Sequence, residues 1–149
     1  MERAKESAID AIETIGVPFE TLNGKTITAL DGAEEGSEAT VFTCDDGSSY
    51  RMYHKQECCE DVRLEEIAGD PKAIVGQEVL AAFESTNREE EARPSPWSES
   101  WTWTFYTVRT MTHTVVFRWL GESSGYYSES VEFRQVTPPV ADRIKENTR

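Results

Sequence analysis

Residues 101–120 constrain the fold most strongly, because aromatic and β-branched side chains alternate there with a period of two. Trp101, Trp103 and Phe105 would share one face of a strand, and Tyr106 and Val108 the other. A short turn leads to a second alternating run, which contains Val115, Phe117 and Trp119. Nine of the fifteen aromatic residues lie within 97–127, so we expect this hairpin to form the centre of a β-sheet.

Further runs of period two predict more strands on both sides of this hairpin. They cover residues 25–30, 39–44, 49–54, 62–67, 77–84 and 127–135. The N-terminal residues differ, because Ala8, Ile12 and Ile15 belong to a run of helical spacing that ends at Gly16. The predicted fold class is therefore α+β and β-rich: a twisted antiparallel sheet of about six or seven strands with one N-terminal helix.

The length of the chain suits one domain, and we expect a single domain over residues 1–149. Its predicted parts are an N-terminal helix (1–16), a first β segment (19–84), a polar loop (85–100), a second β segment (101–136) and a tail (137–149).

The charge of the chain excludes some classes of function. Fifteen Lys and Arg residues oppose 28 Asp and Glu residues, which gives a formal net charge of −13. Such a chain repels phosphate, and this argues against direct binding of nucleic acid. No apolar run is long enough to cross a membrane and the first residues lack the apolar core of an export signal, so we expect a cytoplasmic protein with reduced thiols.

Imidazole and thiol groups stand close together in the stretch His54-Lys55-Gln56-Glu57-Cys58-Cys59-Glu60. Both are good zinc ligands, so His54, Cys58 and Cys59 predict a structural zinc site whose fourth ligand is unknown. If 39–54 is a regular hairpin, Cys44 lies roughly 17 Å from His54, too far to be that ligand. The other candidates are His113, Glu57, Glu60 and a water molecule.

Alternatives to structural zinc stay open at this point. The cysteines could fill small spaces in the core beside a surface histidine, or they could form a vicinal disulfide. A catalytic zinc with Glu57 or Glu60 as general base has little support, because it requires an open metal position in a cleft. The sequence contains no nucleophile elbow, phosphate-binding loop or His-Glu-x-x-His motif, so we do not expect an enzyme.

Acidic residues are concentrated in residues 31–70, where twelve Asp or Glu stand against three Lys or Arg. Such a surface could imitate the phosphates of nucleic acid and occupy a basic groove of another protein. Solubility alone, or an acidic bias shared by all proteins of the host, would explain the same composition. The candidate partner-binding residues are Glu34, Glu35, Glu38, Asp45, Asp46, Glu60, Asp61, Glu65, Glu66, Tyr126 and Tyr127.

The stretch 121–127 joins two predicted strands and is rich in Gly and Ser. Its backbone N–H groups could face a phosphate, but no lysine is present to complete such a site. A plain strand connection is therefore favoured. Tyr126 and Tyr127, and Trp97 in the polar loop, are candidate anchors for a partner.

Three stretches resemble a family of small uncharacterised proteins found in bacteriophages and bacteria. They are 53–62, which contains His-x3-Cys-Cys-Glu, then Trp103-Thr104-Phe105-Tyr106, and 118–131, which contains Trp-Leu-Gly-Glu-Ser-Ser-Gly-Tyr-Tyr. The resemblance covers residues 22–136 and implies that His54, Cys58 and Cys59 belong together without Cys44.

The chain also looks like the small acidic phage proteins with a zinc site that inhibit CRISPR–Cas9. This likeness implies a stoichiometric blocker in the cytoplasm of a bacterial host cell, which binds type II Cas9 and prevents it from loading target DNA. The predicted function is thus an anti-CRISPR inhibitor whose acidic surface meets a basic, nucleic-acid-binding surface. A binding protein for a small nucleotide signal, with its pocket at 121–127, and a metal-dependent enzyme are the alternatives.

Overall fold

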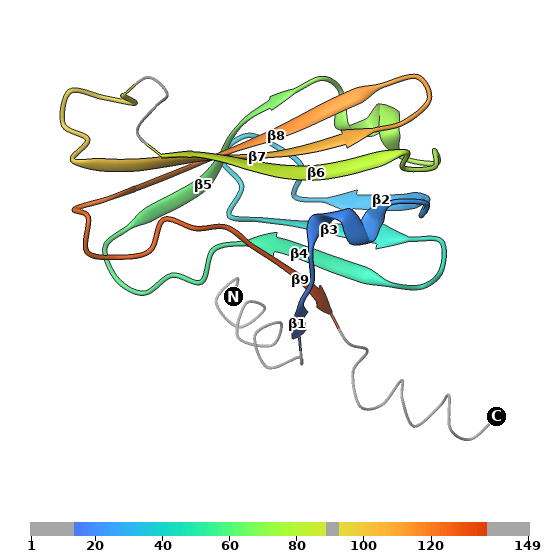
Figure 1. Cartoon of the computed structure of the whole chain (residues 1–149), viewed down its shortest axis with the longest axis horizontal. Helices are drawn as coiled ribbons and strands as arrows, with labels where there is room; N and C mark the ends of the chain where they lie inside the picture. The colour runs from blue at the N-terminus through green and yellow to red at the C-terminus, as the bar shows by residue number, and fades with distance from the viewer. Residues whose placement is uncertain (1–13, 89–92, 137–149) are drawn as a thin grey trace.

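The structure is a computed structural model that describes residues 14–88 and 93–136. These described residues form nine strands in two antiparallel sheets, which lie face to face (Figure 1). The five-stranded sheet has the order β1-β9-β4-β3-β2, and the four-stranded sheet has the order β5-β8-β7-β6. The strands are β1 (Thr14–Gly16), β2 (Ile27–Asp31), β3 (Ala39–Cys44), β4 (Ser49–Tyr53), β5 (Asp61–Ala68), β6 (Ala81–Arg88), β7 (Ser100–Arg109), β8 (Thr114–Ser123) and β9 (Glu132–Val136).

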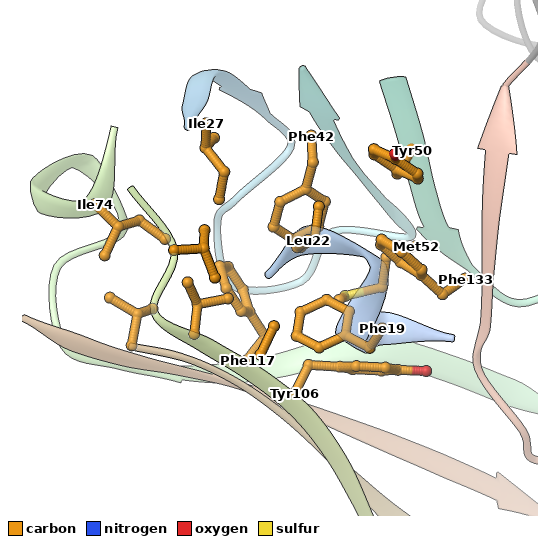
Figure 2. Packing of buried hydrophobic residues seen from close by; sticks show 14 of the residues in the cluster. Phe19, Leu22, Ile27, Phe42, Tyr50, Met52, Ile74, Tyr106, Phe117 and Phe133 are labelled. Carbon is orange, nitrogen blue, oxygen red and sulfur yellow. The ribbon is translucent and has the colours of Figure 1, made fainter. Parts of the chain in front are cut away.

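The core fills the space between the two sheets (Figure 2). Phe42 of β3 is fully buried and meets the ring of Phe117 of β8 edge-on, with ring centroids 5.6 Å apart. Phe133 of β9 stacks on Tyr50 of β4 at 5.4 Å. The indole N–H of Trp119 donates a hydrogen bond to the sulfur of Met52, 3.0 Å away. Phe42 against Phe117 and Met52 against Trp119 therefore join the two layers, and the stack of Tyr50 and Phe133 strengthens the inner face of the five-stranded sheet.

Two short 3-10 helices, η1 (Phe19–Leu22) and η2 (Pro71–Ile74), supply further apolar side chains to this core. Phe19 and Leu22 are buried, and the Phe19 ring lies 4.8 Å from that of Tyr106. Asn23 follows η1, and its side-chain oxygen accepts a hydrogen bond from the backbone N–H of Ala82 in β6 at 2.7 Å. These contacts attach η1 to the first residues of β6.

The alternation in 101–120 is confirmed, because β7 and β8 pair along ten residues each and are the central strands of their sheet. Tyr106, Val108, Phe117 and Trp119 belong to the core between the sheets. The neighbouring positions on β7 face outward, where the rings of Trp103 and Phe105 lie 6.5 Å apart and the guanidinium of Arg118 lies over both.

The predicted fold class is wrong in two respects. The described residues form two sheets rather than one, and their helical segments are the two four-residue 3-10 helices. Ile15, which belongs to the predicted helical run, instead lies in β1 and pairs with Gln135 of β9. The rest of the predicted N-terminal helix (1–13) and the tail (137–149) lie outside the described residues.

The reason for the difference is that a periodicity shows which face of a strand is apolar but not which other strand covers it.

The loop between β6 and β7 is shorter than the predicted polar loop (85–100), because residues 85–88 extend β6 and Ser100 begins β7. Residues 89–92 within that loop lie outside the described residues.

The inter-sheet core makes a testable prediction about stability. Replacing Phe42 by Ala removes a buried ring that contacts both sheets, and should lower the free energy of unfolding by about 3–5 kcal/mol. The matched control is Met111→Ala, because Met111 is 83% exposed and its replacement should change stability by less than about 0.5 kcal/mol. Urea denaturation measures both values, and an equal effect of the two substitutions would contradict this description of the core.

Candidate functional site

Three loops gather at one end of the two sheets, on the left in Figure 1. They are residues 54–60 between β4 and β5, 93–99 before β7, and 124–131 between β8 and β9; we call this region the loop end. A ring nitrogen of His54 lies 2.6 Å from the carbonyl oxygen of Ser130, which joins the first loop to the third. The Ser98 hydroxyl donates to Glu122 of β8 at 2.7 Å, which fixes the second.

The close approach of the third loop to β8 explains the glycine at position 121. A Cβ atom at Gly121 would lie 2.5 Å from the carbonyl oxygen of Glu129, so any other residue there would force the two segments apart. The Glu129 side chain is buried and accepts hydrogen bonds from Thr102 at 2.7 Å and Ser123 at 2.5 Å. The stretch that sequence analysis interpreted as a strand connection therefore packs closely on the sheet.

The carboxylate of Glu60 organises the first loop. It accepts hydrogen bonds from the backbone N–H groups of Glu57 and Cys58, each at 2.9 Å, and it lies 2.8 Å from Nε2 of His54. The side chains of His54 and Glu60 are 4% and 0% exposed. Burial raises the pKa of Glu60, but the hydrogen bonds from His54, Cys58 and Glu57 outweigh it and lower the pKa to about 2.

Both ring nitrogens of His54 face groups that only accept hydrogen bonds, namely the Glu60 carboxylate and the Ser130 carbonyl. These two contacts therefore occupy both ring nitrogens. In this arrangement neither nitrogen of His54 is free to ligate a metal.

The predicted zinc site is therefore wrong. The sulfur atoms of Cys58 and Cys59 lie at disulfide distance from each other, and His54 is paired with Glu60. Within 14–88 and 93–136, no three His, Cys, Asp or Glu side chains are placed to hold a metal ion together. Of the candidate fourth ligands, Glu60 is bound to His54, and His113 lies in the β7–β8 turn, where its ring contacts the Thr112 hydroxyl.

Cys44 is separate from the vicinal pair, as its place in the hairpin predicts. It is the last residue of β3 and is buried, and desolvation raises the pKa of its thiol. Cys58 and Cys59 are exposed on the loop end. The three cysteines therefore differ in accessibility.

Two aromatic side chains at the loop end are almost fully exposed. Trp97 is 88% and Tyr126 is 84% exposed, and the Tyr126 ring touches that of Tyr127 at 5.0 Å between centroids. A shallow cleft of about 270 Å³ adjoins Trp97 and is lined by the carboxylates of Asp61, Glu99 and Glu122, together with Cys59, Ser98, Ser123 and Ser124. Glu99 and Glu122 were missed by sequence analysis, since neither belongs to the acidic stretch and only the fold brings them beside Asp61.

A second group of carboxylates runs along β5, and we call it the acidic edge: Glu34, Glu35, Glu38, Asp61, Glu65 and Glu66. The loop after β2 reaches β5 because the N–H of Gly36 donates to Leu64 at 2.7 Å and the N–H of Leu64 donates to Ser37 at 2.9 Å. Arg63 binds Asp61, Glu65 and Glu122, and Arg118 binds Glu66. Two arginines thus pair with part of this edge, and the carboxylates outnumber them.

The remaining candidate residues lie elsewhere. Asp45 and Asp46 occupy the β3–β4 turn, which Figure 1 places at the end of the sheets opposite the loop end. Asp46 forms an ion pair with Lys25 at 2.5 Å, and hydrogen bonds from Lys25 and Ser48 lower its pKa. Glu60 is buried and therefore has no surface to offer a partner. The acidic stretch of the sequence is thus divided among three places in the fold.

A comparison with known protein families matches residues 20–133 to the domain of unknown function DUF7448. The chain belongs to the DUF7448 family. The matched residues begin within η1 and end within β9, so they include the four-stranded sheet, the loop end and the acidic edge. Of the five-stranded sheet they leave out β1 and the last residues of β9. No curated protein and no solved structure matches the chain. None of the helices in the described part of the DUF7448 protein has the length and apolar character needed to cross a membrane.

The role of Glu60 in the DUF7448 protein predicts a distinct response to acid. Because the pKa of Glu60 is about 2 in the folded chain and 4.5 ordinarily, its ionised form stabilises the fold above pH 4.5. This contribution should decline as the pH falls from about 4.5 through about 2. Glu60→Gln should lower Tm at pH 7 by roughly 5 °C or more and remove this part of the pH dependence.

Calorimetry between pH 7 and pH 2.5 measures these changes. The control is Glu57→Gln, because Glu57 is an exposed carboxylate of the same loop and should give the Tm profile of the unaltered protein. Identical profiles for the two variants would contradict the role assigned to Glu60.

The accessibility of the cysteines predicts their reactivity. After mild reduction, two thiols of the folded protein should react with Ellman's reagent, because Cys58 and Cys59 are exposed. The third, Cys44, is only 3% exposed and should react only after unfolding in denaturant. A Cys44→Ala variant that still gives two fast thiols is the control, and three thiols of equal rate would contradict the described burial.

Proposed function

We propose that this DUF7448 protein is an inhibitor that binds a basic, nucleic-acid-receiving surface of another protein through its loop end. The observation that carries the proposal is the exposure of two aromatic side chains at the loop end, Trp97 and Tyr126. Trp97 lines a cleft together with the acidic residues Asp61, Glu99 and Glu122. Large aromatic side chains are costly to leave in water and are enriched among the residues that dominate interfaces. Exposed anchors beside carboxylates fit a partner that is both apolar and basic.

The acidic edge would contribute mainly to encounter. Its carboxylates lie along β5, which begins at the loop end with Asp61, so the negative charge is continuous with the anchors. A field of one sign attracts a partner of the opposite sign and raises the association rate, whereas exposed ion pairs add little affinity. The aromatic anchors would then supply most of the binding energy.

The partner that we propose is type II Cas9 in the cytoplasm of a bacterial host cell. The reason is the likeness to small acidic phage inhibitors of CRISPR–Cas9, together with an acidic surface that could replace target DNA in a basic channel. The inhibitor would act by occupancy, without turnover, and it would need no metal because the Glu60 carboxylate holds the loop that zinc was expected to hold.

A nucleotide-binding function is less well supported. The loop after β8 borders two separate clefts. One is lined by Asp61, Glu99 and Glu122, and the other by Glu84 and Glu129. These carboxylates repel a phosphorylated ligand, and neither cleft is lined by Lys or Arg.

Cleavage of target DNA by purified Cas9 with its guide RNA tests the proposal. The protein, added before the target, should inhibit cleavage with a stoichiometry near one, and the double variant Trp97→Ala/Tyr126→Ala should bind Cas9 at least about tenfold more weakly. Met111→Ala is the matched control, because Met111 is equally exposed but lies in the β7–β8 turn. Affinity should also fall as salt rises from 50 to 300 mM.

The outcomes separate the parts of the proposal. Absence of binding to Cas9 at tens of micromolar would overturn the choice of partner. Binding that Trp97→Ala/Tyr126→Ala and Met111→Ala weaken equally would overturn the choice of surface. Binding that does not change with salt would contradict the steering role of the acidic edge.

A further inference from the structure

The free edge of the four-stranded sheet is formed by β6. Its Ala82 N–H donates to the side chain of Asn23, so at this position the backbone points away from β7. Backbone groups of a strand point alternately to its two sides, so those of Glu84 and Thr86 point to the same outer side as Ala82. No backbone hydrogen bond joins Glu84 or Thr86 on that side to any residue within 14–88 or 93–136.

A second cleft, of about 280 Å³, opens between the sheets directly beside this edge. It is lined by the inward positions of β6 and β7 and by the third loop of the loop end, namely Glu84, Thr86, Thr102, Thr104 and residues 128–131. Seven of its eight lining residues carry a hydroxyl or a carboxylate group, and neither Lys nor Arg lines it.

The charges in this cleft favour a cation. Glu129 is buried and is held by two hydroxyl groups rather than by a positive side chain. Partial burial raises the pKa of Glu84, and a hydrogen bond from the Tyr106 hydroxyl offsets this only in part. An ammonium or guanidinium group would supply the missing charge and could donate to several of the surrounding oxygens.

We propose that the edge of β6 and this cleft together bind an extended segment of the partner that carries Lys or Arg at alternate positions. The segment pairs with the backbone of Glu84 and Thr86 as an added strand, and one of its basic side chains enters the cleft. The proposal rests on the proposed function, since it describes how a basic partner would be recognised next to the anchors of the loop end.

A second copy of this chain fits the edge less well. Antiparallel pairing of β6 with itself would bring two Glu84 carboxylates close together, and like charges on neighbouring strands destabilise the pairing. A basic segment reverses the sign of that interaction.

The test uses two synthetic peptides, acetylated and amidated, with the sequences (Thr-Lys)3 and (Thr-Glu)3. Their binding to the full chain is followed by the amide NMR shifts of the ¹⁵N-labelled protein. The (Thr-Lys)3 peptide should shift the amides of Glu84 and Thr86, and (Thr-Glu)3 should not. Thr86→Pro removes an outward N–H without removing a bond to β7, and should weaken binding at least fivefold.

Glu84→Gln should also weaken the binding of (Thr-Lys)3, and Glu34→Gln is the control that removes one carboxylate from the acidic edge instead. An equal effect of these two variants, or shifts confined to the acidic edge, would overturn the proposal in favour of general charge attraction. A concentration-dependent dimer that Thr86→Pro abolishes, with no response to either peptide, would overturn it in favour of self-pairing.

This experiment and the Cas9 assay can fail separately. If (Thr-Lys)3 does not bind but Cas9 is inhibited, the loop end is sufficient and the role of β6 is refuted. If the peptide binds at β6 and Cas9 is not inhibited, the partner is another basic protein. Recognition of a basic segment by the β6 edge and its cleft is then still supported.

Discussion

The packing of aromatic rings between the two sheets is the interaction on which the rest of the structure depends. Phe42 and Phe117 meet across the core, and Phe19 and Phe133 join them from η1 and β9. Each sheet contributes one apolar face, so neither layer is stable without the other. This packing aligns the strands, and the alignment brings the loops after β4 and β8, and the loop before β7, to one end (Figure 1).

At that end, the buried side chains of Glu60 and His54 take the place that a metal was expected to fill. The Glu60 carboxylate accepts hydrogen bonds from two backbone N–H groups and lies 2.8 Å from a ring nitrogen of His54, and His54 in turn reaches Ser130 of another loop. Removing Glu60 would leave buried polar groups without partners, which is why the loop depends on it. Sequence analysis grouped His54 with the two cysteines as metal ligands, whereas the structure pairs His54 with Glu60 and Cys58 with Cys59.

Negative charge has different roles at different places in this fold. Asp46 pairs with Lys25, Glu60 with His54, and Glu66 with Arg118. At the loop end one arginine, Arg63, pairs with both Asp61 and Glu122, and Glu99 adds a third carboxylate beside Trp97. A count of acidic residues along the sequence treats all of these alike. The surface available to a basic partner depends on which carboxylates have found a positive side chain, and that is a property of the folded chain.

The sequence by itself determined most of the strands, because a side-chain period of two is a local property that each strand carries in its own residues. The tertiary structure decided that these strands form two sheets and that Cys58 and Cys59 face each other instead of a metal. It also decided that Glu99 and Glu122 join Asp61 beside an exposed tryptophan. The two-sheet arrangement and this group of carboxylates depend on residues far apart in the chain. Both follow from how one apolar face covers another, which no local pattern encodes.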